Sequence, residues 1–119
     1  MTRAVFRQQG SSYDIQIDGH AGFNPGNDIV CAACSMLAFS LLQYVMGLAA
    51  EGKAQIQEAT NGDGKYRLRF SSANAEEAVK VIAGGFMLLS SEYPHNVRFW
   101  REGKTSETAG QTADTSERR

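Results

Sequence analysis

The segment between Asp28 and Glu51 constrains the fold most, because it holds 22 consecutive residues without a charge. Apolar and small side chains fill it, and Gly52 follows it closely. A run of this length is too long for an ordinary strand and predicts one helix over residues 29–50. Since no face of that helix carries a charge, we expect it to be covered on more than one side.

Either lipid or protein could cover such a helix, because 22 uncharged residues are enough to span a bilayer. Ser35, Ser40 and Gln43, together with seven Ala or Cys residues, leave the segment only moderately hydrophobic. Amphipathic segments on both sides also fit a water-soluble domain without a membrane span. A unit of about 100 residues offers one sheet face to one side of the helix. We therefore predict that a second copy covers the other side, in a homodimer.

The chain has 119 residues, 42% apolar and 21% charged, and its net charge is −1. One globular domain is expected, and the near-neutral balance gives no bulk attraction to nucleic acid or anionic membranes. Residues 101–119 contain only Ala109 and Ala113 as apolar residues and cannot bury enough surface to offset their ordering entropy. We expect a folded domain over residues 1–100 and a flexible, non-catalytic tail over 101–119. The first 20 residues show no signal peptide, which favours a cytoplasmic location.

Hydrophobic periodicity predicts the order of the elements. Residues 13–18 alternate between apolar and polar side chains, as in a strand with one buried face. Further strands are expected at residues 4–7, 53–60, 65–70 and 97–100. With the second helix described below, the order is ββαββαβ. It predicts an α+β fold in which helices pack on a mainly antiparallel sheet.

The second helix is expected between Asn74, as its N-cap, and Pro94. Glu77 completes a start that resembles a capping box. Gly84 and Gly85 each weaken such a helix by about 1 kcal/mol relative to Ala. We therefore expect a close approach to a neighbouring element at these glycines.

The residues that could perform chemistry are concentrated in segment 19–31. His20 follows a strand, Cys31 lies in the first turn of the long helix, and the loop between them can fold back to bring the two together. A helix N-terminus and a nearby imidazolium both favour a thiolate, and unpaired N–H groups there could bind an oxyanion. A buried structural cysteine and a histidine that satisfies a backbone group would explain the same residues. Asp28 is assigned first to helix capping, since its charge near Cys31 opposes a thiolate.

Gly19-His20-Ala21, followed by Gly26-Asn27-Asp28-Ile29-Val30-Cys31-Ala32-Ala33-Cys34-Ser35, resembles the motif G-H-A…G-x-D-I-V-C-A-x-x-S of the ribosomal-processing cysteine proteases. The resemblance extends over residues 1–100. It implies a dimeric endopeptidase that removes an N-terminal extension from ribosomal protein twenty-seven of the large subunit, cutting after an aromatic residue. It also implies His20 as base, Cys31 as nucleophile, and Asp28 and Ser35 as supporting residues. No cofactor or metal is expected.

The loop between His20 and Gly26 is about as short as the resemblance to this family allows. Gly22, Phe23 and Gly26 are the loop residues that we expect to contact the substrate. Phe23 is equally well explained as an anchor of the loop. No acid or amide that orients His20 is identified in the sequence, so the expected catalytic unit is a Cys–His dyad.

Three alternatives remain. Cys31 and Cys34 form a CxxC pair, as in thiol–disulfide exchange proteins, although the intervening residues lack the usual Gly-Pro or Pro-His. Zinc could be bound by these cysteines with His20 and His95, but only one ligand pair is closely spaced. Finally, one face of the strand at residues 65–70 would carry the basic side chains Lys65, Arg67 and Arg69, which could touch RNA. The function expected from the motif requires no direct contact with nucleic acid.

Overall fold

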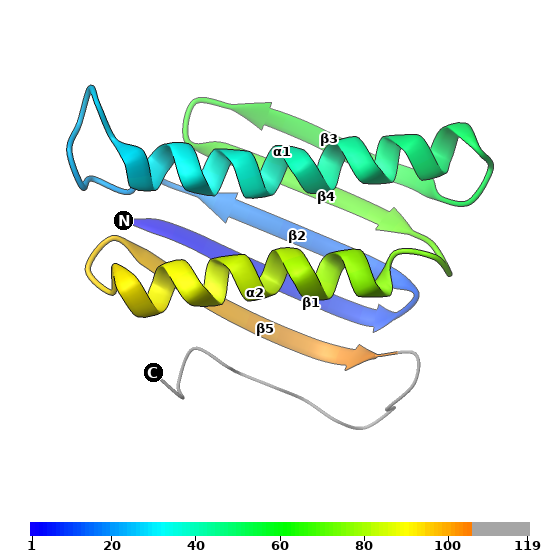
Figure 1. Ribbon diagram of the computed structural model, residues 1–119. Coiled ribbons are helices and arrows are strands. Elements are labelled where there is room, and N and C mark those ends of the chain that lie inside the picture. Colours follow the sequence, from blue (N-terminus) through cyan, green and yellow to red (C-terminus); the bar gives the residue numbers. More distant parts are fainter. Residues whose placement is uncertain (106–119) are drawn as a thin grey trace.

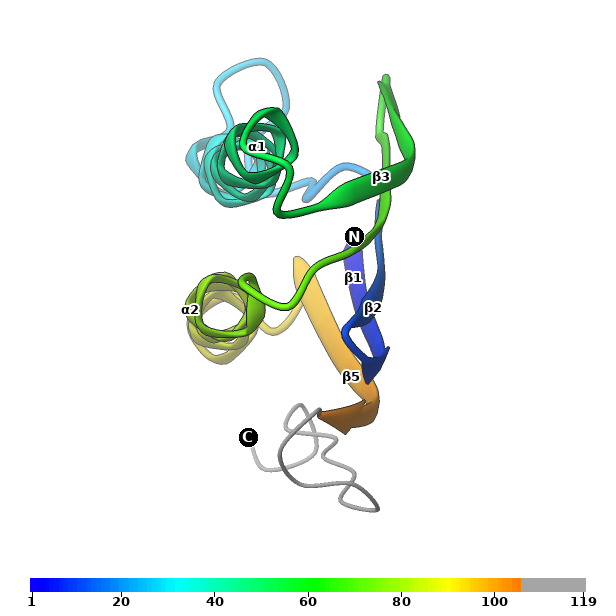
Figure 2. The same ribbon diagram turned by 90° about the vertical axis from the view of Figure 1, so that its right-hand side faces the viewer.

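The computed structural model describes residues 1–105. In this part of the chain five strands form one sheet, and two helices cover one of its faces (Figures 1 and 2). The strands are β1 (Thr2–Gly10), β2 (Ser12–Asp18), β3 (Gln55–Gly62), β4 (Lys65–Ser71) and β5 (Val97–Thr105). The helices are α1 (Ile29–Ala50) and α2 (Glu76–Glu92).

The strands lie side by side in the order β3-β4-β2-β1-β5. Their pairings are antiparallel except that of β1 with β5, which is parallel. Ile15, in the middle of β2, lies opposite Phe6 of β1 and Leu68 of β4. The predicted α+β fold, the element order ββαββαβ and the mainly antiparallel sheet are therefore confirmed.

The core lies between the sheet and the helices, because alternate side chains of each strand point toward α1 and α2. Tyr13, Ile15 and Ile17 of β2 are buried there, as their alternation with polar residues predicts. The Phe6 ring lies between two other aromatic rings, with centroids 5.7 Å from Phe86 and 5.5 Å from Phe99. This cluster joins α2 to the β1–β5 half of the sheet.

Helix α1 has the bounds expected from the sequence, but its two sides differ. Its inner face is buried on the sheet through Val30, Cys34, Ala38, Leu41, Val45 and Leu48. Its outer face exposes large apolar side chains, among them Ile29, Met36, Phe39, Tyr44 and Met46. By length and composition alone this helix could also cross a membrane, but its inner face is buried within the fold. One copy of the chain thus covers only one side of α1.

Two boundaries differ from the sequence expectation. β5 continues beyond residue 100 to Thr105, because its parallel pairing with β1 extends to Gly10, so the folded unit does not end at residue 100. The rest of the expected tail lies outside the described residues. The predicted N-cap Asn74 is wrong: α2 begins at Glu76 after Ala75, without a side-chain cap. The Asn74 N–H instead donates to Ser72 Oγ, which itself donates to the Lys53 carbonyl.

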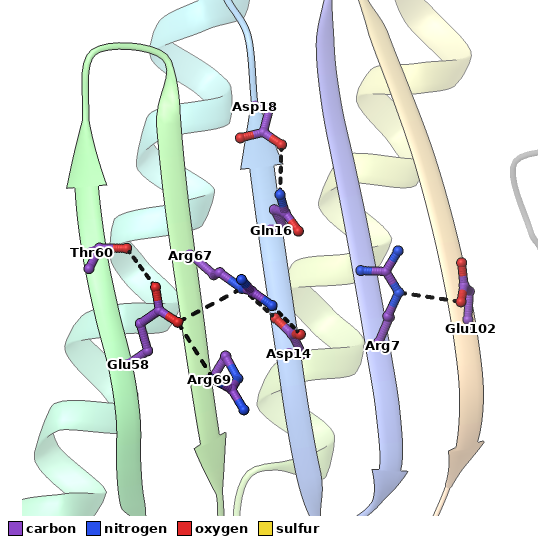
Figure 3. Close-up of polar contacts among 9 residues, drawn as sticks. All are labelled: Arg7, Asp14, Gln16, Asp18, Glu58, Thr60, Arg67, Arg69 and Glu102. Carbon is purple, nitrogen blue, oxygen red and sulfur yellow. Dashed lines mark hydrogen bonds and ion pairs between the residues drawn. The ribbon is translucent and has the colours of Figure 1, made fainter.

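The sheet face away from the helices is polar and carries paired charges (Figure 3). Arg67 donates two hydrogen bonds to Asp14, at 3.2 and 2.9 Å. This hydrogen-bonded pairing with Arg67 lowers the pKa of the Asp14 carboxyl. Arg69 lies 3.7 Å from Glu58, and Arg7 lies 3.4 Å from Glu102. The basic stripe of β4 is therefore largely balanced by acids on neighbouring strands.

Gly84 and Gly85 give a direct test of how closely the two helices pack. A Cβ at Gly85 would lie 2.6 Å from Leu37 Cδ2 of α1, whereas one at Gly84 would meet nothing within 4 Å. Gly84→Ala is expected to raise the free energy of unfolding by about 0.5–1 kcal/mol through helix propensity. Gly85→Ala is expected to lower it by about 1 kcal/mol, because overpacking outweighs that gain. Chemical denaturation measures both.

Leu37→Ala is the matched background for this comparison, since it removes the side chain that the new methyl group would strike. In it, Gly85→Ala should become neutral or stabilising. Equal stabilisation by the two glycine substitutions in the native background would contradict the proposed close contact.

Candidate active site

Three segments that are distant in sequence meet at one edge of the molecule, on the left in Figure 1. They are the end of β2 with His20, the start of α1 with Cys31, and the β3–β4 turn at Asp63 and Gly64. A cavity of about 250 Å³ lies between them. It is lined by Thr2, Ile17, Gly19, His20, Cys31, Cys34, Ser35, Ala38, Phe39, Gly62, Asp63, Gly64, Lys65 and Tyr66.

The His20 imidazole and the Cys31 sulfur face one another at this cavity. His20 Nδ1 lies 3.9 Å from Cys31 Sγ, a distance that allows a hydrogen bond to sulfur. The His20 side chain is 61% exposed, and Cys31 is half-buried. The strand–loop–helix unit therefore brings together the two groups that the sequence places eleven residues apart.

Asp28 holds the start of α1 and the loop before it. Its Oδ1 accepts the N–H of Cys31 at 2.8 Å, and its Oδ2 accepts those of Phe23 at 2.9 Å and Asn24 at 3.2 Å. Desolvation works against ionisation of this carboxyl, but the backbone donors, led by Cys31, outweigh it and lower its pKa. Asp28 is thus the N-cap, as expected.

The same hydrogen bonds occupy the N–H groups that the sequence analysis expects to bind an oxyanion at the start of α1. The N–H of Cys31 is already donated to Asp28 Oδ1, and that of Ala32 to the Asp28 carbonyl. These two donors at the helix start are therefore engaged and do not point freely into the cavity. The expectation that helix-start N–H groups stand ready for an oxyanion is wrong for both.

The loop residues lie outside the cavity wall. Gly22, Phe23 and Gly26 are exposed and are not among the described residues that line the cavity. The Phe23 ring packs edge-on against Tyr93 at 5.3 Å, which supports its interpretation as a loop anchor. Ser35, by contrast, lines the cavity one helical turn beyond Cys31.

Cys34 faces the core, as the sequence analysis expects. Its side chain is buried beside Thr2, and burial raises the pKa of the thiol to about 11. Phe39 and Tyr66 form an aromatic wall of the cavity, with ring centroids 6.0 Å apart. The Tyr66 hydroxyl donates to the Ala38 carbonyl at 2.8 Å, which ties β4 to α1 behind the cavity.

Asp63 is the residue that sequence reasoning missed. Its Oδ1 lies 3.1 Å from His20 Nε2, on the side of the ring opposite Cys31. The Asn61-Gly62-Asp63-Gly64 turn was recognisable, but its place beside His20 follows from the antiparallel pairing of β2 with β4. In that register Asp18 lies opposite Lys65, so the turn and residues 19–20 extend past the same sheet edge.

Within residues 1–105 no group of three or more His, Cys, Asp or Glu side chains is arranged to hold a metal ion. A thiol beside an imidazole at the rim of a cavity is the arrangement that thiol-dependent hydrolases use. The fold and the site therefore point to the class of cysteine hydrolases.

Comparison with known proteins identifies the family. The model of the cysteine protease Prp family matches residues 1–98, so the chain belongs to this family and is a cysteine protease. The ribosomal processing cysteine protease Prp of Staphylococcus aureus strain Mu50 is 31% identical over 94 residues, which cover 76% of this chain and 87% of that protein.

Solved structures show the same fold. The essential ribosomal processing protease Prp of S. aureus, with a covalently linked product peptide, superposes with a TM-score of 0.70 at 23% identity, covering 86% of this chain and all of that one. The same protease with a substrate peptide gives a TM-score of 0.64 at 20% identity, with the same coverage.

The two cysteines should differ sharply in reactivity. At pH 7.5 iodoacetamide is expected to alkylate Cys31 and to leave Cys34 unmodified, because the Cys34 thiol is buried and almost fully protonated. Peptide mapping by mass spectrometry measures the two sites, and the denatured chain, in which both react, is the control. Alkylation of Cys34 at a rate close to that of Cys31 would contradict the structure and revive the thiol–disulfide exchange alternative.

Proposed function

We propose that this protease removes the N-terminal extension of ribosomal protein twenty-seven of the large subunit through a Cys31–His20 dyad. The observation that carries the proposal is the approach of His20 Nδ1 to Cys31 Sγ at the cavity. The relative in S. aureus is named for ribosomal processing, and its solved structures contain peptides. The residues match the expected motif at each catalytic position. With such a substrate, we also propose that the enzyme acts in the cytoplasm.

The chemistry follows from these two groups. His20 Nδ1 takes the proton of the Cys31 thiol, and the thiolate attacks the scissile carbonyl carbon. The imidazolium then gives its proton to the leaving amine as the peptide C–N bond breaks, which leaves a thioester on Cys31. Water, deprotonated by His20, attacks the thioester and releases the acyl product with the thiol restored. The scheme needs no cofactor.

Asp28 and Ser35 have supporting places in this scheme. Asp28 fixes the backbone of Cys31 and of the loop, so that the sulfur keeps its position relative to the ring. Ser35 lies on the cavity wall, where a bound peptide would pass. The aromatic wall of Phe39 and Tyr66 adds apolar surface for a large side chain next to the scissile bond.

The direct test is incubation of the precursor ribosomal protein with the enzyme, followed by mass analysis of the products. The expected product lacks the N-terminal extension and begins after an aromatic residue. Cys31→Ser should lower the rate by about 10³-fold or more, whereas Cys34→Ala should retain most of it. A Cys31→Ser enzyme that keeps most of its turnover would contradict the proposed dyad. Failure of the wild type to cut the precursor would contradict the proposed substrate.

We also propose that α1 mediates a homodimer. The 22 residues of the helix carry no charge, and its outer face exposes large apolar side chains from Ile29 to Met46, a length of about 26 Å. In a two-fold symmetric dimer this face of one copy packs against the same face of the other. The contact removes from water an apolar surface that a monomer would leave exposed. Phe39 belongs both to this face and to the cavity wall, so a second copy would border the active site.

Met36, 69% exposed on the outer face, is the site for testing the dimer. Met36→Lys should convert a dimer to a monomer at micromolar concentration, as measured by analytical ultracentrifugation, because an unpaired charge would be buried in the contact. Thr60→Lys, on the exposed edge strand β3, is the matched control and should remain dimeric. A wild-type chain that sediments as a monomer would rule out the dimer.

A further inference from the structure

The His20 ring is held between two partners. Cys31 Sγ faces Nδ1 at 3.9 Å, and Asp63 Oδ1 faces Nε2 at 3.1 Å. The Asp63 carboxylate is thus at ion-pair distance from Nε2, and its exposed side chain can turn to accept from Nε2–H. Such a bond keeps the proton of the neutral ring on that nitrogen, and this leaves the lone pair of Nδ1 directed at the thiol. That is the tautomer a base needs in order to take the proton from sulfur.

The turn that carries Asp63 is fixed against the same histidine by its backbone. The Gly19 N–H donates to the Gly64 carbonyl at 2.8 Å, so the residue before His20 is tied to the residue after Asp63. A Cβ at Gly64, where φ is +68°, would lie only 3.0 Å from His20 Nε2. The backbone of the β3–β4 turn therefore lies directly against the ring, next to the residue that carries the carboxylate.

We infer that Asp63 is a positioning residue for the protease reaction: it orients the His20 imidazole toward Cys31 by accepting a hydrogen bond at Nε2. This inference rests on the Cys31–His20 dyad proposed above. Asp63 lies on the far side of the ring from the sulfur and acts through His20.

The exposure of the pair decides which property of Asp63 matters. The Asp63 side chain is 95% exposed and that of His20 is 61% exposed, so solvent and salt screen the attraction between their charges. Orientation by a hydrogen bond does not depend on a net charge. An amide oxygen at the same position should therefore serve almost as well as a carboxylate.

Two measurements separate this role from a purely structural one. Cleavage of the precursor ribosomal protein gives kcat and KM, and the rate of Cys31 alkylation by iodoacetamide reports on the thiol without any peptide. Asp63→Ala is expected to lower kcat and the alkylation rate each by about fivefold, with KM changed by less than twofold, as loss of one hydrogen bond implies. Asp63→Asn should stay within about twofold of the wild type in all three.

Asp18→Ala is the matched control, because it removes a carboxylate of the same kind two residues before His20. The Asp18 carboxylate accepts from Gln16 and not from the His20 ring (Figure 3). It should leave both rates within twofold of the wild type. The inference is overturned if Asp63→Ala behaves like the wild type, if Asp63→Asn falls as far as Asp63→Ala, or if Asp18→Ala falls equally.

The same experiment keeps the two proposals apart. If Cys31→Ser and His20→Ala abolish cleavage while Asp63→Ala does not lower it, the dyad stands and the role of Asp63 is wrong. If the wild type fails to cut the precursor, the proposed substrate is wrong, and the alkylation rates still test whether Asp63 orients His20 toward Cys31.

Discussion

The site depends first on the carboxylate of Asp28. Its two oxygens accept N–H groups from both ends of the loop, those of Phe23 and Asn24 on one side and that of Cys31 on the other. These bonds close the loop and begin the helix at the same point. Without them, the approach of Cys31 to His20 would depend on the other contacts of the loop, such as the Phe23–Tyr93 ring contact and the hydrogen bond from Asn96 to the Ala21 carbonyl. The capping carboxylate thus helps to bring two groups that are eleven residues apart in sequence to 3.9 Å from each other.

The sheet supplies the second restraint. Because β2 pairs with β4 across about 50 residues of sequence, the end of β2 and the β3–β4 turn lie at one sheet edge. The Gly19–Gly64 backbone bond continues that pairing by one step beyond the strands. His20 is therefore fixed from the sheet side, and Cys31 from the helix side. The cavity lies where these two layers meet.

Local signals in the sequence were sufficient for some of this arrangement. The absence of charge from 29 to 50 gave both ends of α1, and the alternation at Tyr13, Ile15 and Ile17 gave the buried face of β2. Non-local pairing was not accessible in the same way. The parallel partnership of β1 with β5 explains why β5 extends to Thr105, where the composition suggested a tail.

The residues around the site also divide into those that local sequence signals identify and one that non-local strand pairing brings in. His20, Cys31 and Asp28 lie within twelve residues of one another, so a local motif could group them. Asp63 is brought to His20 by strand register, and nothing in its own neighbourhood marks it as more than a turn residue. The predicted N-cap of α2 was wrong for a different reason. The Asn74 N–H donates to Ser72 Oγ, and Asn74 lies before the start of the helix at Glu76.

Asp28 also determines how the thiol can be activated. A helix N-terminus attracts negative charge, yet here a carboxylate already accepts the N–H of Cys31 and offsets the positive end of the helix dipole. The N–H of Cys31 is therefore already used by one anion at the helix start and is not free for a second. In the proposed dyad the proton of the thiol leaves to a group outside the helix, and His20 Nδ1 is the nitrogen that faces it. Since that transfer requires one ring nitrogen to be free and correctly aimed, the geometry on the far side of the imidazole becomes as consequential as the distance to sulfur.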